Sequence, residues 1–494
     1  MTDRISGEDR GHGRGWTAGL VLAGSVLLSL HVGVLRVALP FIRDDLDTGI
    51  TGIQVVGGAG LVVVTATLVA FGRLADLSGA ARVYATGLAG FAVGLVVSAL
   101  APSLTWLVLA QMAQGVGWSM CVGSGPALLV RGFPASQRSR ALAGNHMAIA
   151  AGLGLGPALG GVVVEQLGWR WGFAGLGPPA LTLAGLATAR LPAGNPDRDR
   201  TRSESFDLAG SAVLASGLVA LLLLVLGAGA LDADLMVILV AASVTALAGF
   251  LILERRSEAP LFDLRLFADR RFSFGVAASF LDFVAMAANM FLLPFLLVDH
   301  LALGATRAGM VMAVVPLTIV AAAPMAGIAA DRIGSRRPAT AGLGALTLAI
   351  VAMAALRPGT PLGWVVAVLA LYGVGAALFQ SPNVSDVLGT VVAGRVGMAA
   401  GALATAGRLG QVLGVAVAGG VWQAGLRHHG STVAGTSAAF RDAFLVLACF
   451  GFLAMVASWA RGDTEPVSAS AGAERPAGHA GGAPADEAPP TEPI

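Results

Sequence analysis

The amino-acid sequence predicts an all-α integral membrane protein with about fourteen transmembrane helices. Of its 494 residues, 56% are apolar and only 12% are charged, whereas about a quarter of the residues are charged in a soluble domain. Apolar runs of about 20 residues recur along the chain, so most of its surface must face lipid. These runs are continuous rather than alternating, which indicates helices rather than a barrel of strands.

The predicted spans are apolar segments, each about long enough to cross ~30 Å of hydrocarbon as a helix. They occupy residues 16–40, 50–71, 83–101, 104–130, 141–164, 171–190, 208–229, 232–253, 272–298, 303–329, 338–356, 362–388, 398–424 and 440–460. The first span follows three arginines and ends at Leu39-Pro40 without a small-residue cleavage site. This pattern is typical of a spanning helix rather than a signal peptide.

The arginines predict the orientation, because cytoplasmic loops carry an excess of basic residues. Placing the N-terminus inside also places the main arginine clusters inside, and an even number of spans returns the C-terminus to the same side. The outside loops instead carry Asp44, Asp45 and Asp47. We therefore expect a multi-pass protein of the cytoplasmic cell membrane with both termini in the cytoplasm. The inside clusters are Arg131, Arg138, Arg140; Arg190, Arg198, Arg200, Arg202; Arg255, Arg256, Arg265, Arg270, Arg271; and Arg332, Arg336, Arg337.

The spans divide the chain into segments with different predicted roles. Charged residues interrupt the apolar pattern near residues 191–206, and the residues after 462 are rich in Ala, Gly, Pro, Ser and Glu, a composition that favours disorder. The expected segments are a cytoplasmic N-terminus (1–15), a six-helix half (16–190), a cytoplasmic linker (191–206), two inserted helices (207–254), a cytoplasmic loop (255–271), a second six-helix half (272–461) and a disordered cytoplasmic tail (462–494).

Composition also excludes several classes of partner. A net charge of +2 is too small to indicate a nucleic-acid partner. The two cysteines, Cys121 and Cys449, both lie in apolar segments, which argues against a disulfide framework or a cysteine metal site. The sequence shows no nucleophile–base pair and no phosphate-binding loop. We expect no enzyme activity, no metal and no cofactor, but a monomer in the lipid bilayer with a small-molecule substrate.

One local pattern occurs twice, 255 residues apart, in short loops between two spans on the inside. Its glycines permit a tight turn, and its aspartate can lie at a helix N-terminus or pair with an arginine. The residues are Gly72, Asp76, Gly79 and Arg82 in the first copy, and Gly327, Asp331, Arg332, Gly334, Arg336 and Arg337 in the second. The pattern resembles motif A of the major facilitator superfamily, which lies at matching places in the two halves of its members.

The resemblance extends over residues 16–460 and implies the fold of that superfamily, two six-helix halves. The pair of spans at 208–253 looks like the two extra helices of the fourteen-helix drug:proton antiporter family. The segment 260–267, which precedes the next span, is also similar to that family. The resemblance implies protons as the coupling ion.

A glycine-rich segment in the fifth span contains Gly152, Gly156, Pro157, Gly160 and Gly161. Glycines at 152, 156 and 160 form a stripe along one helix face, against which another helix can pack closely, and the proline bends the helix. The segment resembles motif C, the antiporter motif of exporters in this superfamily. The alternative is generic small-residue packing in a chain with 68 glycines.

Several positions depart from the pattern of the drug exporters, among them Val55 and Gly60 in the second span and the basic residues missing from the first motif A. His31 stands where the family has an acidic residue, Arg36 replaces an asparagine, and Gln111 takes the place of the motif B arginine. In the family these positions are associated with proton coupling and substrate contact. The departures leave the predicted fold unchanged and alter the expected coupling residues.

Ionisable residues that remain inside the spans are functional candidates, because an unpaired charge in the membrane is costly. Asp282 lies about ten residues into its span, and a carboxylate in a partly dry cavity holds a proton more readily than one in water. We predict Asp282 as the proton-responsive group; the alternative is a structural ion pair with Arg408. His31 is the second candidate, since imidazole titrates near neutral pH, and its alternative is a packed neutral histidine.

Polar residues within the spans are candidates for the substrate cavity, or alternatively tie helices together. The first, fourth, seventh and tenth core helices line the cavity in the superfamily. Arg36 alternatively extends toward the outer membrane surface, because it precedes Pro40 by four residues. The candidates are Arg36, Gln111, Gln114, Asn289, Asn383 and Arg408.

The leading functional hypothesis is a secondary active transporter that exports hydrophobic or amphipathic small molecules, as multidrug or antibiotic exporters do, by proton-coupled alternating access. A second hypothesis keeps the fold but assigns one dedicated metabolite or lipid as substrate, with non-standard coupling. A third is a membrane sensor that does not transport.

Overall fold

The computed structural model describes residues 2–191, 216–217, 220, 233–256, 264–391, 396–430 and 432–462. The described residues form helices joined by short loops, with no strand among them. The N-terminal half contains α1 (Thr2–Asp45), α2 (Ile50–Ser78), α3 (Ala80–Ala99), α4 (Leu104–Gly132), α5 (Ala135–Leu167), α6 (Trp169–Ala174) and α7 (Gly177–Arg190).

The C-terminal half also corresponds to six predicted spans, but here the second span, rather than the sixth, is divided into two helices. It contains η1 (Leu264–Ala268), α10 (Arg270–Phe295), a π-helical turn η2 (Leu296–His300), α11 (Ala305–Met312), α12 (Val314–Ile333), α13 (Arg336–Ala354), α14 (Leu362–Gly389), α15 (Val396–His429) and α16 (Val433–Ala460). Between the halves, α9 (Ala233–Arg256) lies where the sequence predicts the second inserted helix.

Ten spans within the described residues are long and apolar enough to cross a membrane. The predicted span at 104–130 is the continuous helix α4. It is not one of the ten, because Gln111 and Gln114 lower its mean hydropathy. The predicted span at 171–190 is divided into α6 and α7 just before Pro178 and Pro179, because proline is accepted in the first turn of a helix and not in its interior. The all-helical membrane fold is confirmed.

Three predicted segments lie largely or wholly outside the described residues. They are the linker at 191–206, the first inserted helix at 208–229 and the tail at 462–494. The predicted domain boundaries therefore stay predictions.

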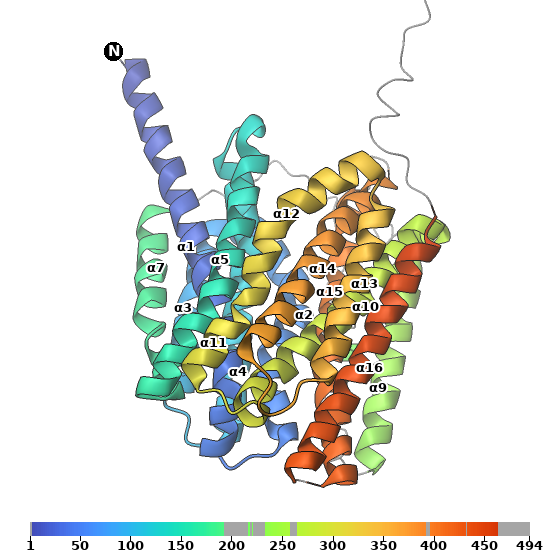
Figure 1. The fold of residues 1–494 in the computed structure, drawn as a ribbon. Coiled ribbons are helices and arrows are strands. Elements are labelled where there is room, and N and C mark those ends of the chain that lie inside the picture. Colours follow the sequence, from blue (N-terminus) through green and yellow to red (C-terminus); the bar gives the residue numbers. More distant parts are fainter. Residues whose placement is uncertain are drawn as a thin grey trace, which may run out of the picture.

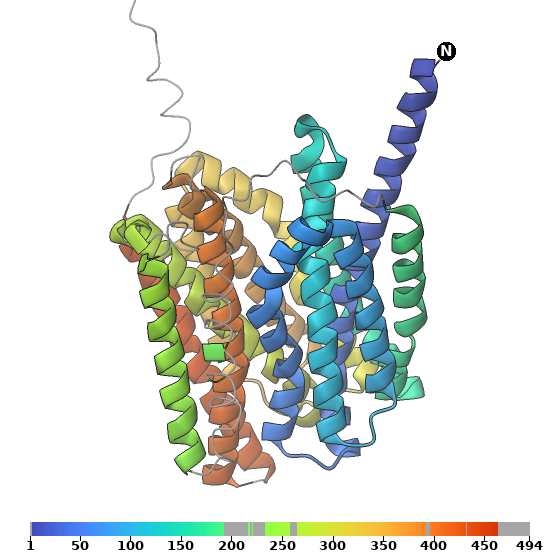
Figure 2. The same cartoon turned by 180° about the vertical axis from the view of Figure 1, so that it is seen from behind.

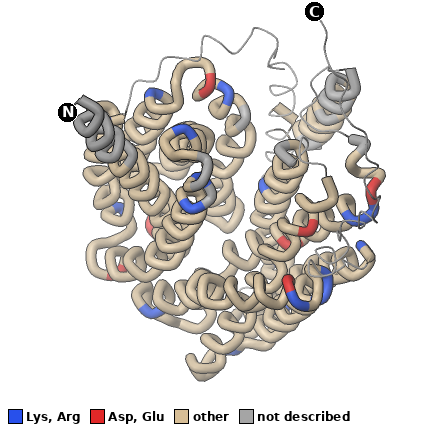
Figure 3. The backbone as a smooth tube through the Cα atoms, turned by 90° about the horizontal axis from the view of Figure 1, so that it is seen from above, with Lys and Arg blue, Asp and Glu red and all other residues tan. Residues whose placement is uncertain are grey.

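The helices run up and down the bundle, and α1 begins at the end of the bundle where α16 ends (Figure 1). The view from behind shows α9 at the periphery, next to the C-terminal half (Figure 2). We call the end at which α1 begins the inner end, following the predicted orientation. Charged residues on helix ends and loops are visible from that side (Figure 3).

Two tight loops at the inner end each contain a glycine with a positive φ at the matching position. Gly79 joins α2 to α3 with φ 97°, and Gly334 follows α12 with φ 78°. Both values lie in the left-handed region, which glycine adopts without a steric penalty. The repeated sequence pattern thus has a repeated conformation, and it reverses the chain within one or two residues in each half.

Candidate functional site

Close packing of α5 against α1 fixes the position of the polar residues on α1. A Cβ atom added to Gly156 would lie 2.7 Å from the backbone oxygen of Leu30 and 2.9 Å from the Cα atom of Gly33. Gly152 and Gly160 contact α1 in the same way, one turn to either side. Gly161 instead faces Ala305 of α11, in the other half. The glycine stripe therefore holds α1, and the residues beside the stripe touch the second half.

The C-terminal half uses the same device between α10 and α15. A Cβ atom on Gly410 would lie 2.5 Å from the backbone oxygen of Phe280, and Gly414 lies equally close to Val284. This contact fixes the stretch of α10 that carries Asp282. The two helix pairs occupy matching places in the two halves, since each joins the first and fifth core helices.

Asp282, Asn289 and Tyr372 form a polar group in the C-terminal half. Asp282 and Asn289 are 0% exposed, and Tyr372 of α14 lies close enough to both to interact with them electrostatically. Among the described residues, the two oxygens of Asp282, the amide of Asn289 and the hydroxyl of Tyr372 have no hydrogen bond of good geometry. Gln380 lies beside Asp282, yet its amide donates to the sulfur of Met286 at 3.6 Å.

Arg36 brings the N-terminal half to this group. Its Nη1 atom donates to the sulfur of Met290 on α10 at 2.7 Å, and its charge interacts with Tyr372. The guanidinium is thus directed to the other half rather than to the outer membrane surface. We define Arg36, Asp282, Asn289, Met290 and Tyr372 as the central polar group.

Arg408 does not join the central polar group as an ion pair. Its Nη1 atom donates to Gln411 of its own helix at 3.3 Å. Both oxygens of Asp282 lack a partner within the described structure. The geometry therefore gives no support to a structural Asp282–Arg408 pair.

The polar residues of the N-terminal half have other surroundings. The His31 ring lies against two aromatic rings, with centroids 5.2 Å from Phe91 and 5.7 Å from Phe173, and Gln111 lies beside it. Gln114 donates to the backbone oxygen of Gly94 at 3.0 Å and to Ser98 at 2.5 Å, which ties α4 to α3. His31 is thus packed among aromatic rings with no hydrogen-bond partner for its Nδ1 atom in the described structure, and the roles predicted for His31 and Gln114 stay predictions.

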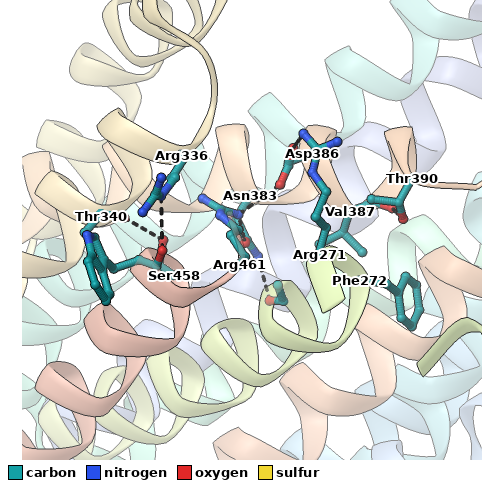
Figure 4. Close-up of polar contacts among 12 residues, drawn as sticks. Arg271, Phe272, Arg336, Thr340, Asn383, Asp386, Val387, Thr390, Ser458 and Arg461 are labelled. Atoms are coloured by element: carbon teal, nitrogen blue, oxygen red, sulfur yellow. Dashed lines mark hydrogen bonds and ion pairs between the residues drawn. The ribbon is translucent and has the colours of Figure 1, made fainter. Parts of the chain in front are cut away.

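Asn383 lies with a different set of residues from Asn289. Its amide nitrogen donates to the backbone oxygen of Gly275 at 3.2 Å, and its oxygen accepts a hydrogen bond from Arg461 at 2.8 Å (Figure 4). Both contacts belong to the inner end of the C-terminal half. The structure thus separates Asn383 from the predicted cavity residues.

The two repeated loops make unequal contacts. Asp76 pairs with Arg131 at the end of α4, with 2.9 Å between the charged atoms, and Arg82 is exposed. A Cβ atom on Gly72 or on Gly327 would meet open space, so the difference between the loops lies in their charged residues. In the second loop Arg336 donates to the backbone oxygen of Trp459, while Asp331, Arg332 and Arg337 are exposed.

Polar contacts between the two halves gather toward the outer end. Arg43, near the end of α1, binds the carboxylate of Asp299 through both Nη atoms, at 2.5 and 3.2 Å. Gln54 donates to the backbone oxygens of Val415 and Ala416, and Glu165 accepts from the backbone nitrogen of Thr306. The halves are therefore joined at the outer end in this conformation.

Sequence reasoning did not single out Tyr372 or Met290. Tyr372 is one of two tyrosines in the chain, and its scarcity in an apolar span was the available signal. Met290 carries no such signal, because methionine is an ordinary core residue.

Comparisons with known proteins give one consistent picture. The sequence model of the Major Facilitator Superfamily matches residues 21–415 and also 275–489. The riboflavin transporter RibZ of Clostridioides difficile is 32% identical over 400 residues, which cover 80% of this chain and 86% of RibZ. The multidrug resistance protein Stp of Mycobacterium tuberculosis is 30% identical over 408 residues, or 82% of this chain and 75% of Stp.

Solved structures show the same fold at low sequence identity. A bacterial homologue of the human lysosomal transporter Spinster, in an inward-facing and unoccupied conformation, matches with a TM-score of 0.64 and 15% identity over 91% of this chain and 97% of its own. A peptide transporter in complex with sulfate matches with a TM-score of 0.66 and 14% identity over 89% and 94%. The predicted arrangement of helices is thereby confirmed.

Proposed function

Because this chain belongs to the Major Facilitator Superfamily and is a secondary transporter, we propose that it exports hydrophobic or amphipathic small molecules in exchange for protons. The halves alternate between a conformation joined at the outer end and one joined at the inner end. In this proposal the chain works as a monomer with both termini in the cytoplasm, as the arginines predict.

One observation carries the proton coupling: the carboxylate of Asp282 is fully buried and has no ion pair and no hydrogen bond of good geometry among the described side chains. A buried carboxylate without a counter-charge is stable only when it is protonated. It releases its proton when water or a cation reaches it, which a change of conformation can bring about. Asp282 therefore has the environment that a proton carrier requires.

Arg36 supports the proposal by linking Asp282 to the relative position of the halves. It reaches α10 from α1, where it donates to the thioether of Met290, which is a weak acceptor. A guanidinium so poorly paired is available to a substrate or to a carboxylate after a rearrangement. Movement between the halves thus changes the charge environment near Asp282.

The test is accumulation of dyes and antibiotics in an efflux-deficient bacterium that expresses the protein, with and without a protonophore. Wild type should lower accumulation, protonophore should reverse this, and Asp282→Asn should abolish it. The matched control is Asp47→Asn, which neutralises an exposed carboxylate at the outer end. Wild-type behaviour of Asp282→Asn would remove Asp282 from the mechanism and make His31→Gln the next variant.

A second candidate function is dedicated transport of one metabolite, and the similarity to RibZ favours a flavin-like one. The central polar group supports it, because its amide, hydroxyl and carboxylate suit a ligand rich in hydrogen-bonding groups. Radiolabelled riboflavin transport in proteoliposomes tests this candidate. Saturable riboflavin transport without drug export would favour it over the first proposal, and drug export without riboflavin transport would reject it.

A further inference from the structure

Arg461, directly after α16, is a buried arginine with an incomplete set of partners. Only 1% of the residue is exposed. Its Nη1 atom donates to the oxygen of Asn383 at 2.8 Å and lies 3.3 Å from an oxygen of Asp386 (Figure 4). Both partners are on α14, so Arg461 fastens the inner end of α16 to that of α14.

The opposite edge of this guanidinium has no hydrogen-bond acceptor in the part of the chain that the structure describes. Nε and Nη2 of Arg461 are buried without an acceptor. These two nitrogens share one edge of the planar group, and their N–H bonds point in parallel. That fork is the one that grips a carboxylate or a phosphate through two hydrogen bonds. A buried fork without an acceptor is unfavourable, so an occupant with two oxygens would stabilise it.

The positive charges around Arg461 also favour the binding of an anion. Arg271 of α10 lies 3.9 Å from the other oxygen of Asp386, and its own Nε is buried without an acceptor among the described atoms. Arg271 and Arg336 both lie close enough to Arg461 to repel it. Two guanidinium groups, those of Arg461 and Arg271, thus lie beside the carboxylate of Asp386, and Asp269 adds one further nearby negative charge.

The level of this cluster in the membrane is marked by Trp459. This residue is 64% exposed, and the guanidinium of Arg336 lies over its ring at 5.7 Å. Exposed tryptophans gather at the level of the lipid headgroups. Arg271 is 41% exposed, so it offers an approach to the cluster from outside. The cluster therefore lies where phosphate groups of the inner leaflet are found.

We propose that Arg461 and Arg271 form a binding site for a phosphate group, occupied by the headgroup of an anionic phospholipid. The phosphate oxygens accept hydrogen bonds from Nε and Nη2 of Arg461 and from Nε of Arg271. Bound there, the lipid holds together the inner ends of α10, α14 and α16. Inorganic phosphate offers the same oxygens, so the test separates the two sources.

The experiment measures the melting temperature Tm of the purified full-length protein in nanodiscs of phosphatidylcholine, with and without phosphatidylglycerol. A parallel arm adds inorganic phosphate, against chloride of equal ionic strength, to protein in detergent. Arg461→Lys keeps the charge and removes the fork, and Arg271→Gln removes the second donor. The control is Arg131→Gln, which removes an exposed arginine at the inner end of the other half.

Phosphatidylglycerol should raise Tm for wild type and for Arg131→Gln by a few degrees, and Arg461→Lys and Arg271→Gln should lose most of this increase. If inorganic phosphate alone produces the increase with the same dependence on the variants, the phosphate site stands and the lipid is rejected as its occupant. An increase that survives in both site variants, or no increase in either arm, overturns the proposal. If Arg461→Lys does not fold, Arg271→Gln makes the same comparison.

Discussion

The two halves of this transporter share a backbone plan and differ in what they bury. In each, glycines press the fifth core helix against the first: Gly156 against α1, and Gly410 against α10. The N-terminal pair encloses His31 among aromatic rings, whereas the C-terminal pair encloses Asp282, whose oxygens form no hydrogen bond of good geometry within the described structure. The repeated architecture therefore sets the positions of the helices, while single side chains determine which half holds the proposed proton-coupling residue.

The largest expected effect separates the two buried candidates. Asp282→Asn should reduce protonophore-sensitive export to the background of cells without the protein, because an amide cannot exchange the proton. His31→Gln should change export less than about threefold, since a packed ring loses mainly van der Waals contacts. Both are measured as initial efflux rates at equal expression. An inverted result would assign proton coupling to the N-terminal half.

Both halves share a glycine contact between their first and fifth core helices. It is tested by replacing one contact glycine in each half with alanine. Gly156→Ala and Gly410→Ala should each lower the free energy of unfolding by about 1–3 kcal/mol, because the new Cβ meets backbone atoms that cannot move aside easily. Thermal unfolding in detergent measures this loss.

The matched controls are Gly144→Ala in α5 and Gly401→Ala in α15, where a Cβ has room. These should be neutral or stabilising by up to about 1 kcal/mol. Equal effects in controls and contact variants would mean that the glycines do not set the helix spacing.

A smaller effect is expected where the halves meet at the outer end. Arg43→Gln should weaken the closed outer end by up to about 1 kcal/mol, or about fivefold in population, the range measured for partly exposed ion pairs. In a background of Cys121→Ser and Cys449→Ser, labelling of Gly57→Cys by a membrane-impermeant maleimide reports opening, because residue 57 packs against Phe291 of the other half. Labelling should accelerate, and Arg43→Asp combined with Asp299→Arg should slow it again.

The smallest effect is expected at the exposed inner loop of the N-terminal half. The side chains of Asp76 and Arg131 are 42% and 45% exposed, so Asp76→Asn should change the free energy of unfolding by less than about 1 kcal/mol. Thermal unfolding at low and high salt checks this, since salt should erase the difference. A larger, salt-independent loss would indicate that this loop is as strongly held as the Arg461 cluster.

Much of the fold follows from the sequence because a bilayer admits few solutions. Long apolar runs must become helices, and the duplicated loop pattern places two halves side by side. The division of one predicted span into α6 and α7 was not predicted, although Pro178 and Pro179 gave the signal. Counting apolar residues does not show where one helix ends and the next begins within a span.

The site was predictable only as far as charge reveals it. Asp282, Arg36 and His31 are conspicuous in apolar runs, but their partners are apolar or neutral residues from distant helices. Asn383 resembles a cavity residue in sequence, yet it binds Arg461, 78 positions away. Which end of a bundle such a residue serves depends on helix tilt and register, and these are fixed by packing across the whole molecule.

The contact of Gly161 with Ala305, and of Gly309 with Pro157, has a mechanical consequence. Here the backbones of α5 and α11 touch without side chains between them, so this point can turn but cannot be compressed. A rocking motion of the two halves would have this contact as its fulcrum. Because α5 and α12 extend from this region to the inner end, a small rotation at the contact would produce a large displacement of their inner ends.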